Sequence, residues 1–552
     1  MNAYSIDAIR SASESDRGRE YISAIAALYN EKFKGKPISE LTHSDYALYE
    51  TEGNRRAYEA PYFERRERLS LLEVLAVADE EYVGDLEEII KAICDESTWL
   101  VPAHAYAGID LFATETAAAL AETYTILSGR LSDGIRERIM LALNERIVRI
   151  YENGSFWWEN AACNWSSVCA AGIGITYMLC FSERAAAVMP RLIASAAAYL
   201  ESLDGEGYCY EGVNYWQYGF ANFCRFFLAY SRFCGKRHPL SDSPKAINTL
   251  AYLENSEMDG NVYLPFADGG FRRWCPCSHY MSIIAQLYPD SIMPPKHITL
   301  PFEKGTGLED LCCIGMNSSY VPPSKQESTY YERAEVFISR KRSFSFAVKC
   351  GSNAELHNHN DIGAFQIVSG GRRLICDVGA GNYTKEYFGT PEQRYSIFAC
   401  SSLAHSVPIV DGKLQSYGEN YRGRVLAHDE SSVRMNLAGA YSDGPQSLIA
   451  DYRVNEEGVT LSYSAKGVNE SIIFHFVSDV EPVMSEGQLL IGNMRLSTDL
   501  ALSPTVRAEK YLPHYPTRGE LSGASEHVAY IIEYAITCQG KAEASFSFDF
   551  KE

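Results

Sequence analysis

Two histidines, His357 and His359, stand one residue apart in "AELHNHNDIGAF", in a chain that has only 12 histidines. If this stretch forms a strand, both imidazoles point to the same face, because strand side chains alternate between faces. Downstream, Asp377 ends the apolar run "LICDVGAG", and His405 precedes another in "SSLAHSVPIVDG". Two histidines and one aspartate from three strands are a common set of zinc ligands, so we predict a metal site here. If only one member of the first pair binds metal, the other is free for chemistry.

Each of these residues alone has an ordinary explanation. An isolated histidine is usually a satisfied surface or core group, and an aspartate at the end of a strand usually caps a turn. The four residues nevertheless fall within one short stretch of the chain. Their combination favours a functional site.

The elements that must position these residues change character along the chain. From about residue 20 to 290 the apolar spacing is mostly helical, as in "DGIRERIMLALNERIVRIYE". After about residue 300 come short runs with alternating or β-branched residues, such as "AEVFISRKR" and "SIIFHFVS". A chain of 552 residues also exceeds the roughly 250–300 at which one core stops growing. We therefore predict an α+β chain with a helical domain over residues 1–305 and an antiparallel β-sandwich over 306–552.

The composition limits the classes of partner. The formal net charge of −21 argues against nucleic acid, whose binding needs clustered Lys and Arg, but a local arginine cleft can still bind an anionic substrate. No apolar run reaches the ~18 residues of a membrane span. The start of the chain, "MNAYSIDAIRSASESDRGREY", has no apolar signal region, and the 15 cysteines have no regular spacing. We expect a cytoplasmic protein with no membrane partner; the oligomeric state is not predicted.

Aromatic and glycine-bearing loops separate the predicted helices. In "ENGSFWWENAACNWSSVCA" and "LDGEGYCYEGVNYWQYGF" such loops recur on the same side of successive helices if the helices pair up and down. They would then form one rim. Tyr215 and Tyr218 are three residues apart and would share a helix face, although core packing is the commoner role for any single aromatic residue.

The stretches "HNHNDIGAFQIVSGGRRLICDVGAGNY" and "YSIFACSSLAHSVPIVDG" resemble the heparinase II/III-like polysaccharide lyases. In that family a helical toroid of paired helices precedes a β-sandwich. The resemblance covers the whole architecture and is most specific over residues 357–411. It implies that His359, Asp377 and His405 bind a divalent metal, usually Zn²⁺, in a structural role, and that His357 is catalytic.

The same resemblance implies roles in the helical half. Asn164 corresponds to an asparagine that neutralises the substrate carboxylate, although Trp165 stands where relatives often have histidine. Tyr218 resembles the catalytic tyrosine better than Tyr215 does, so we expect it to act as general acid and also as base, with His357 as base or proton partner. The residues that we expect to contact substrate are Trp165, Trp216, Glu211, His104 and Arg394.

The resemblance predicts a lyase that cleaves uronate-containing glycans by β-elimination and leaves a 4,5-unsaturated uronate. Glycosaminoglycans such as heparan sulfate, chondroitin or hyaluronan are the first expectation and alginate the second, so the partner would be an acidic oligo- or polysaccharide. Two alternatives remain: a metal-dependent glycan hydrolase, in which zinc activates water, and a non-catalytic carbohydrate-binding protein of the same fold.

Overall fold

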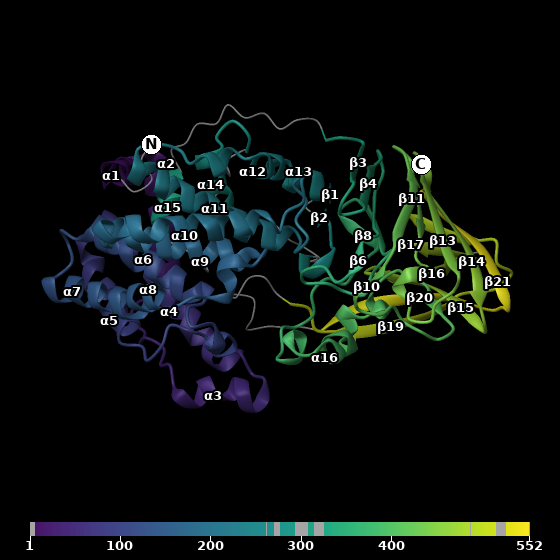
Figure 1. Cartoon of the computed structure of the whole chain (residues 1–552), viewed down its shortest axis with the longest axis horizontal. Helices are drawn as coiled ribbons and strands as arrows, with labels where there is room; N and C mark the ends of the chain where they lie inside the picture. The colour runs from purple at the N-terminus through teal and green to yellow at the C-terminus, as the bar shows by residue number, and fades with distance from the viewer. Residues whose placement is uncertain are drawn as a thin grey trace.

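The computed structural model describes residues 6–260, 262–269, 277–292, 307–313, 325–485, 487–514 and 526–550. Figure 1 shows helices gathered in one half of the molecule and strands in the other. The predicted fold class is confirmed: an α/α toroid of paired helices precedes an antiparallel β-sandwich. No helix of the described part is both long and apolar enough to span a membrane.

The helices lie almost entirely in the first half of the chain. They are α1 (Ile6–Glu14), α2 (Asp16–Lys32), α3 (His43–Glu52), α4 (Arg56–Ala78), α5 (Val83–Cys94), α6 (Leu111–Leu127), α7 (Asp133–Leu143), α8 (Arg149–Asn153), α9 (Asn164–Cys180), α10 (Ser182–Leu200), α11 (Val213–Cys234), α12 (Pro244–Asn248), α13 (Tyr252–Ser256), α14 (Ser278–Leu287), α15 (Gly307–Cys313) and α16 (Pro391–Ser396).

Helix α9 is the central helix of this half, and it packs against α6, α10 and α11. Its sequence "VCAAGIGITYM" is apolar on every side, as expected for a helix surrounded by others. Gly172 lets α9 approach α6 closely, because a Cβ at this position would lie only 2.4 Å from the carbonyl oxygen of Thr114. Since α9 begins at Asn164, this contact helps to fix that residue in place.

We predict that Gly172→Ala lowers the free energy of unfolding by about 1–3 kcal/mol, because the added methyl group must push α6 and α9 apart. Thermal unfolding of the purified variant measures this change. Gly129→Ala is the matched control, since nothing lies within 4 Å of a Cβ at Gly129. Equal unfolding temperatures for the two variants would contradict the prediction.

The strands form three main sheets. The first sheet contains β3 (Ser328–Tyr331), β4 (Val336–Arg340), β5 (Ser345–Lys349), β7 (Phe365–Ser369) and β8 (Arg372–Ile375). The second contains β9 (Ile409–Val410), β15 (Ser471–Ser478), β19 (Thr505–Tyr511) and β20 (His527–Thr537). The third contains β11 (Arg424–His428), β12 (Ser432–Asn436), β13 (Ser447–Val454), β14 (Gly458–Val468), β16 (Val483–Ser485), β17 (Gln488–Ile491), β18 (Met494–Thr498) and β21 (Gly540–Phe550). Two short pairs accompany them, β1 (Glu257–Asp259) with β2 (Val262–Tyr263) and β6 (Ser352–Asn353) with β10 (Gly418–Arg422).

Alternation along the strands builds the sandwich core. In β13 every second residue is buried, among them Leu448, Ala450 and Tyr452. Its neighbour β14 follows the same pattern, and Ala450 lies opposite Tyr463 across the antiparallel pair. A strand with one buried face has its register fixed, because a slip of one residue would turn every apolar side chain outward.

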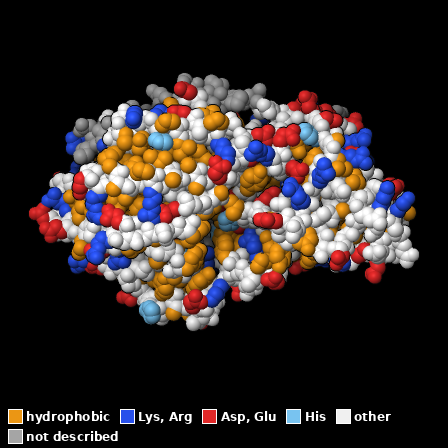
Figure 2. All heavy atoms as spheres, in the orientation of Figure 1, with side chains coloured by type: hydrophobic (Ala, Val, Ile, Leu, Met, Phe, Trp, Pro, Cys, Tyr) orange, Lys and Arg blue, Asp and Glu red, His pale blue; other side chains and the backbone are white. Residues whose placement is uncertain are grey.

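Segments from both halves meet at the junction. Figure 2 shows the surface hollowed where the halves come together. Lys385 of the β half pairs with Glu50 of α3, and the Tyr383 hydroxyl lies 2.9 Å from that of Tyr215 in α11. The boundary between residues 305 and 306 stays a prediction; α15, which lies just beyond it, packs against α1, α4 and α14 of the helical half.

Candidate active site and metal centre

A buried carboxylate, that of Asp268, lies at the centre of the junction. It belongs to the short 3₁₀ turn η7 (Ala267–Gly269) and has no exposed surface. Its Oδ2 lies 2.6 Å from Nδ1 of His357, and its Oδ1 lies 2.9 Å from Nε2 of His359. Although burial alone would raise it, the charge of Arg394 and the two histidine hydrogen bonds hold the pKa of Asp268 well below its usual range. The ionised carboxylate therefore accepts both bonds.

Two backbone features bring these residues together. Gly212 has φ +93°, and a Cβ there would lie 2.9 Å from Cα of Gly269, so the chain before α11 runs directly against the Asp268 turn. His357 itself has φ +56°, the left-handed region that non-glycine residues rarely adopt. Residues 354–364 form turns and irregular chain, so the prediction of a strand with both imidazoles on one face was wrong. Their common partner, Asp268, aligns the two rings instead.

The imidazole of His357 lies between groups of different chemistry. Its ring stacks on the ring of Tyr215, with centroids 4.1 Å apart and planes 25° apart. With the Nδ1 proton given to Asp268, its Nε2 carries a lone pair, and this atom lies 3.6 Å from Oε2 of Glu211. One fifth of the side chain is exposed, so His357 is open to a substrate.

Glu211 connects this histidine to Asn164. The backbone N–H of Asn164, the first residue of α9, donates to Oε1 of Glu211 over 3.0 Å. No described residue forms a hydrogen bond with the Asn164 side-chain amide, and 3% of the residue is exposed. Burial raises the pKa of Glu211 to about 7, and the nearby His357 limits the rise. The predicted residues Asn164, Glu211 and His357 therefore belong to one cluster.

The two tyrosines that the sequence singled out lie in different surroundings. Tyr215 contacts His357 and lies within hydrogen-bond distance of Tyr383, whereas the hydroxyl of Tyr218 donates to Oε1 of Glu115 over 2.8 Å. Burial, together with the negative charge of Asp268, raises the pKa of Tyr215. The geometry thus favours Tyr215 as the partner of His357, and the expected role of Tyr218 stays a prediction.

Two predicted substrate contacts need correction. Trp216 has no exposed surface; its Nε1 donates to Thr249 over 2.8 Å and its ring packs on Phe220. A helix turns by about 100° per residue, so Trp216 points into the core while Tyr215 faces the junction. Arg394 donates to the carbonyl oxygens of Asn358 and Tyr387, at 3.0 Å each. Its guanidinium group therefore fixes the loop that contains His357 and His359 (the histidine loop), and these nitrogens are not free to bind a substrate carboxylate.

His104 and Trp165 lie beside the cluster. Their ring centroids are 4.7 Å apart, and Trp165 also contacts Trp157, whose surface is 48% exposed. Because Trp165 directly follows Asn164, these rings form an apolar surface next to the side-chain amide of Asn164. Such exposed aromatic faces suit stacking against sugar rings, and the predicted contacts of Trp165 and His104 stay predictions.

Three potential metal-ligand atoms lie close together, one each from His359, Asp377 and His405. These atoms all lie within 4.8 Å of one another and all three residues are buried. His359 donates its Nε2 proton to Asp268, His405 directs Nε2 at the carbonyl of Ala399 over 3.1 Å, and Asp377 uses Oδ1 for the N–H of Gly379. Three side-chain atoms are not used in these hydrogen bonds: Nδ1 of each histidine and Oδ2 of the aspartate.

Those three remaining atoms have no hydrogen-bond partner. Nδ1 of His405 and Oδ2 of Asp377 lie 3.0 Å apart, within ion-pair distance if Nδ1 carries a proton and close enough to bind one cation if it does not. The donor set fits a divalent cation with nitrogen and oxygen ligands, and the hydrogen bonds on the far nitrogens are the supports such ligands usually have. The three predicted ligands are therefore brought together.

The sequence did not identify Asp268, Tyr383 or Tyr387. Asp268 lies 89 residues before His357, in "PFADGG", which resembles an ordinary turn. Tyr387 donates a hydrogen bond to Asp268 and also lies 3.3 Å from His359. The only available signal was the cluster of tyrosines in "GAGNYTKEYF", directly after the predicted ligand Asp377.

Comparison with known proteins finds a family match in the part of the chain that carries the histidines. Residues 324–461 match the family model described as heparinase II/III-like, C-terminal. This stretch is therefore similar to the C-terminal domains of heparinase II/III-like proteins. The matched residues include His357, all three predicted metal ligands and Arg394. The match covers a quarter of the chain, and no curated protein sequence matches the chain as a whole.

Solved structures extend the likeness over both halves. A heparinase III superposes with a TM-score of 0.62 at 14% identity, over 99% of this chain and 91% of that one. A mutant heparan sulfate lyase from Pedobacter heparinus gives 0.59 at 11% identity, over 98% and 93%. The chondroitin AC lyase of Streptomyces coelicolor A3, in complex with chondroitin sulphate, gives 0.57 at 10% identity, over 99% and 83%. The whole chain thus has the fold of these lyases.

We predict that Asp377→Asn lowers both the bound metal and the thermal stability, because the variant removes the only anionic ligand. Metal content by mass spectrometry should fall from about one equivalent to near zero, with a loss of several degrees in Tm. Asp443→Asn is the control, since the Asp443 side chain is 90% exposed. Full metal content in Asp377→Asn would contradict the assignment.

We predict that Glu211 makes unfolding depend on pH. Its pKa of about 7 in the folded protein exceeds the ~4.3 of an unfolded chain, so the folded state binds more protons between these values and its stability falls as pH rises through them. Glu211→Gln removes this loss. The free energy of unfolding of the variant, relative to that of the wild type, should therefore rise by about 2–3 kcal/mol between about pH 4.5 and pH 8.

Chemical unfolding at the two pH values measures this difference. Glu201→Gln is the control, because Glu201 precedes the same loop but its side chain is 69% exposed. The prediction fails if the stability difference between Glu211→Gln and wild type stays constant with pH.

Proposed function

We propose that this protein is a polysaccharide lyase that cleaves uronate-containing glycans by β-elimination. One observation carries the proposal: His357, with Nδ1 held by Asp268, stacks on Tyr215 at the junction of the two halves. A base and an acid in contact, beside the side-chain amide of Asn164, are the groups that such an elimination needs. The lyases that share the fold support the choice of reaction.

Proton abstraction begins the reaction. The proton on C5 of a uronate lies next to a carboxylate, and it becomes acidic enough only when donors neutralise that carboxylate. The side-chain amide of Asn164 is the donor that we assign to it. Nε2 of His357 then accepts the C5 proton, because its lone pair is kept available by the Nδ1–H bond to Asp268.

Proton donation completes the reaction. As the C4–O bond breaks and the C4=C5 double bond forms, the departing oxygen needs a proton. Tyr215 supplies it, since its raised pKa keeps the phenol protonated and Tyr383 supports its hydroxyl at 2.9 Å. No water is consumed, and the proton moves from His357 back to tyrosine through solvent before the next turnover. Tyr218 is the alternative acid.

The metal that His359, Asp377 and His405 would hold serves the structure in this proposal. A divalent cation there would supply charge that ties three segments of the β half together. The three ligands are 0–2% exposed, so the site is closed to a substrate. That burial disfavours the hydrolase alternative, in which a metal-bound water must reach the glycosidic bond.

We assign acidic glycans as the substrate, with glycosaminoglycans such as heparan sulfate or chondroitin first and alginate second. Heparinase III and chondroitin AC lyase share the fold, and they are named for glycans of the first kind. The aromatic surface of Trp165 and Trp157 beside Asn164 would hold the sugar rings, and the amide would meet the carboxylate.

The deciding measurement is absorbance near 230 nm, where an unsaturated uronate absorbs, during incubation with heparan, chondroitin, hyaluronan and alginate oligosaccharides. We expect a rise with at least one glycosaminoglycan. New reducing ends without this absorbance would identify a hydrolase and overturn the proposal. Absence of both signals with every glycan would favour the binding protein.

We predict that Tyr215→Phe lowers kcat by about 100–10,000-fold, because the variant removes only the proton donor. Tyr218→Phe should reduce kcat by less than about tenfold, since the Tyr218 hydroxyl is bonded to Glu115. Initial rates at 230 nm measure both, and equal unfolding temperatures show that each variant folds. The reverse order of effects would transfer the acid role to Tyr218.

A further inference from the structure

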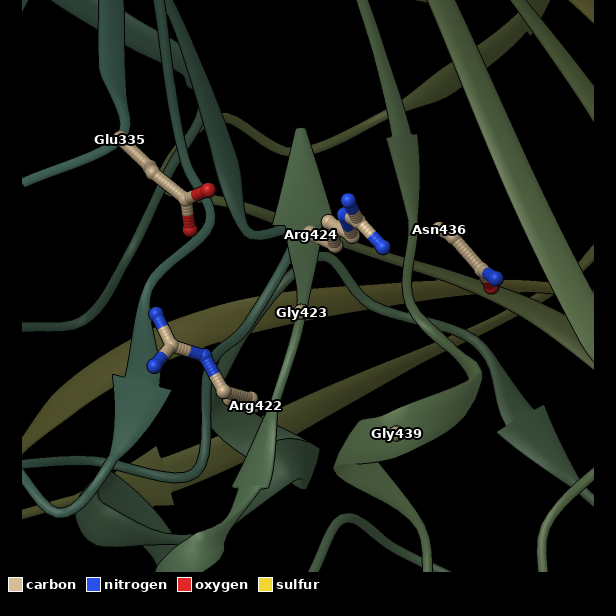
Figure 3. Close-up of a pocket in the computed structure, with 6 residues that line it drawn as sticks. All are labelled: Glu335, Arg422, Gly423, Arg424, Asn436 and Gly439. Carbon is tan, nitrogen blue, oxygen red and sulfur yellow. The ribbon is translucent and has the colours of Figure 1, made fainter. Parts of the chain in front are cut away.

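A second polar pocket lies in the β half, and none of the residues in the proposed active site lines it. It has a volume of about 420 Å³ and is lined by Glu335, Arg422, Gly423, Arg424, Asn436 and Gly439. Figure 3 shows that both arginines come from the run that joins β10 to β11, with Glu335 on one side and Asn436 on the other. This volume falls within the ~300–1,000 Å³ of small-ligand sites.

The backbone at Gly423 turns both arginines outward. A Cβ on Gly423 would lie 2.4 Å from Sγ of Cys350 and 2.7 Å from Ile362, so this position faces the core. Side chains of extended chain alternate, and the residues on either side, Arg422 and Arg424, therefore face the solvent, where both are exposed. Arg422 ends β10 and Arg424 begins β11, and in Figure 3 their side chains extend to opposite sides of the chain, toward Glu335 and Asn436 respectively.

Among the described residues none forms an ion pair or hydrogen bond with the side chain of Arg422 or Arg424. The nearby carboxylate of Glu335 is engaged elsewhere, because Oε2 accepts the N–H of Gly351 over 3.0 Å and Oε1 that of Val425 over 3.3 Å. In a chain with 71 acidic and 50 basic residues, two arginines this close in sequence without an acidic partner among the described residues are a distinct local feature.

Asn436 adds a directed donor. Its Oδ1 accepts the N–H groups of Ala438 and Leu448, each over 3.2 Å, which fixes the amide and leaves Nδ2 to donate. Asn436 is also the cross-strand neighbour of Arg424. The pocket thus combines two planar guanidinium groups, the amide donor of Asn436 and the carboxylate of Glu335, whose oxygens can each accept a further hydrogen bond.

We propose that this pocket binds one acidic sugar unit of a glycan chain, away from the reaction site. The arginines would pair with its carboxylate or sulfate in bidentate fashion, and Glu335 and Asn436 would bond to its hydroxyl groups. A single inorganic anion would leave most of the pocket unfilled and would meet a repelling carboxylate. The identity of the ligand as a glycan rests on the proposed function.

A series of contacts leads from the active site toward the strand that carries Arg422. Asn358, next to His357, donates to the Tyr395 hydroxyl over 3.4 Å, and the Tyr395 ring stacks on Tyr417 at 5.2 Å. Strand β10 starts directly after Tyr417 and ends at Arg422, and because its register against β6 is irregular the two residues are at most about 17 Å apart. A long substrate leaving the cleft can therefore be held at a second point, whereas a short one cannot.

The test compares Arg422→Gln/Arg424→Gln with the control Arg434→Gln/Arg453→Gln, which removes the same charge from the β half but at residues 55% and 74% exposed near Asp451. Binding of a heparan sulfate tetrasaccharide and dodecasaccharide is measured by calorimetry in a Tyr215→Phe background, which slows cleavage. We expect about tenfold weaker binding of the dodecasaccharide only, and only in the first variant. Hydrogen exchange should show residues 418–428 protected by the dodecasaccharide, with this protection lost in that variant.

Equal dodecasaccharide affinity in the two double variants would overturn the inference. Inorganic sulfate serves as a second probe: if it loses binding in Arg422→Gln/Arg424→Gln while the dodecasaccharide does not, the pocket takes a free anion and the glycan assignment is wrong. Failure of the proposed function is separate, because it appears as a lack of 230 nm absorbance with the wild type. Weakened dodecasaccharide binding in the first variant would then still support the pocket.

Discussion

The buried carboxylate of Asp268 is the interaction on which the junction depends. An ionised carboxylate without water costs several kcal/mol unless hydrogen bonds and opposite charges compensate it. Here His357, His359 and Tyr387 bond to it, and Arg394 lies 3.6 Å away. Because Asp268 comes from the helical half and these partners from the β half, the need to satisfy one charge holds the two halves in a single arrangement.

The histidine loop is also held in place by a residue of the β half itself. Lys349, buried in β5, lies 2.9 Å from Asp361 and 3.3 Å from Glu355, the two acidic residues on either side of the histidine pair. This ion triad closes the loop at both ends and helps to maintain the left-handed backbone of His357. Strained conformations of this kind persist where the surroundings fix them, and they concentrate at functional sites.

Local patterns in the sequence predicted part of the site. His359, Asp377 and His405 could be found because each stands at a recognisable place, beside another histidine or at the end of an apolar run. The strand geometry assumed for the pair was wrong, because the ion triad and the left-handed residue override local alternation. The role of Asp268 could not be predicted, since its partners are 89 and 91 residues away and nothing in "PFADGG" signals a buried charge.

The helical half shows the same limit. The repeated apolar spacing was enough to predict paired helices, and the run "NYWQY" indicated a special helix start. Which of its aromatic residues face the junction depends on the exact angle at which α11 begins. Gly212 sets that angle through its contact with Gly269, which sequence spacing does not reveal.

The shared carboxylate also bears on how such a protein can change over evolutionary time. Neither half can be exchanged for a foreign counterpart without leaving Asp268, or the histidines that bond to it, buried and uncompensated. Recombination at the boundary between the halves is therefore expected to be selected against, the more so because the hydrophobic core of the helical half continues into Val336, Ile338 and Val368 of the first sheet. The two domains are expected to be inherited together, and variation in substrate preference is left to the loops and surface pockets that do not touch this charge.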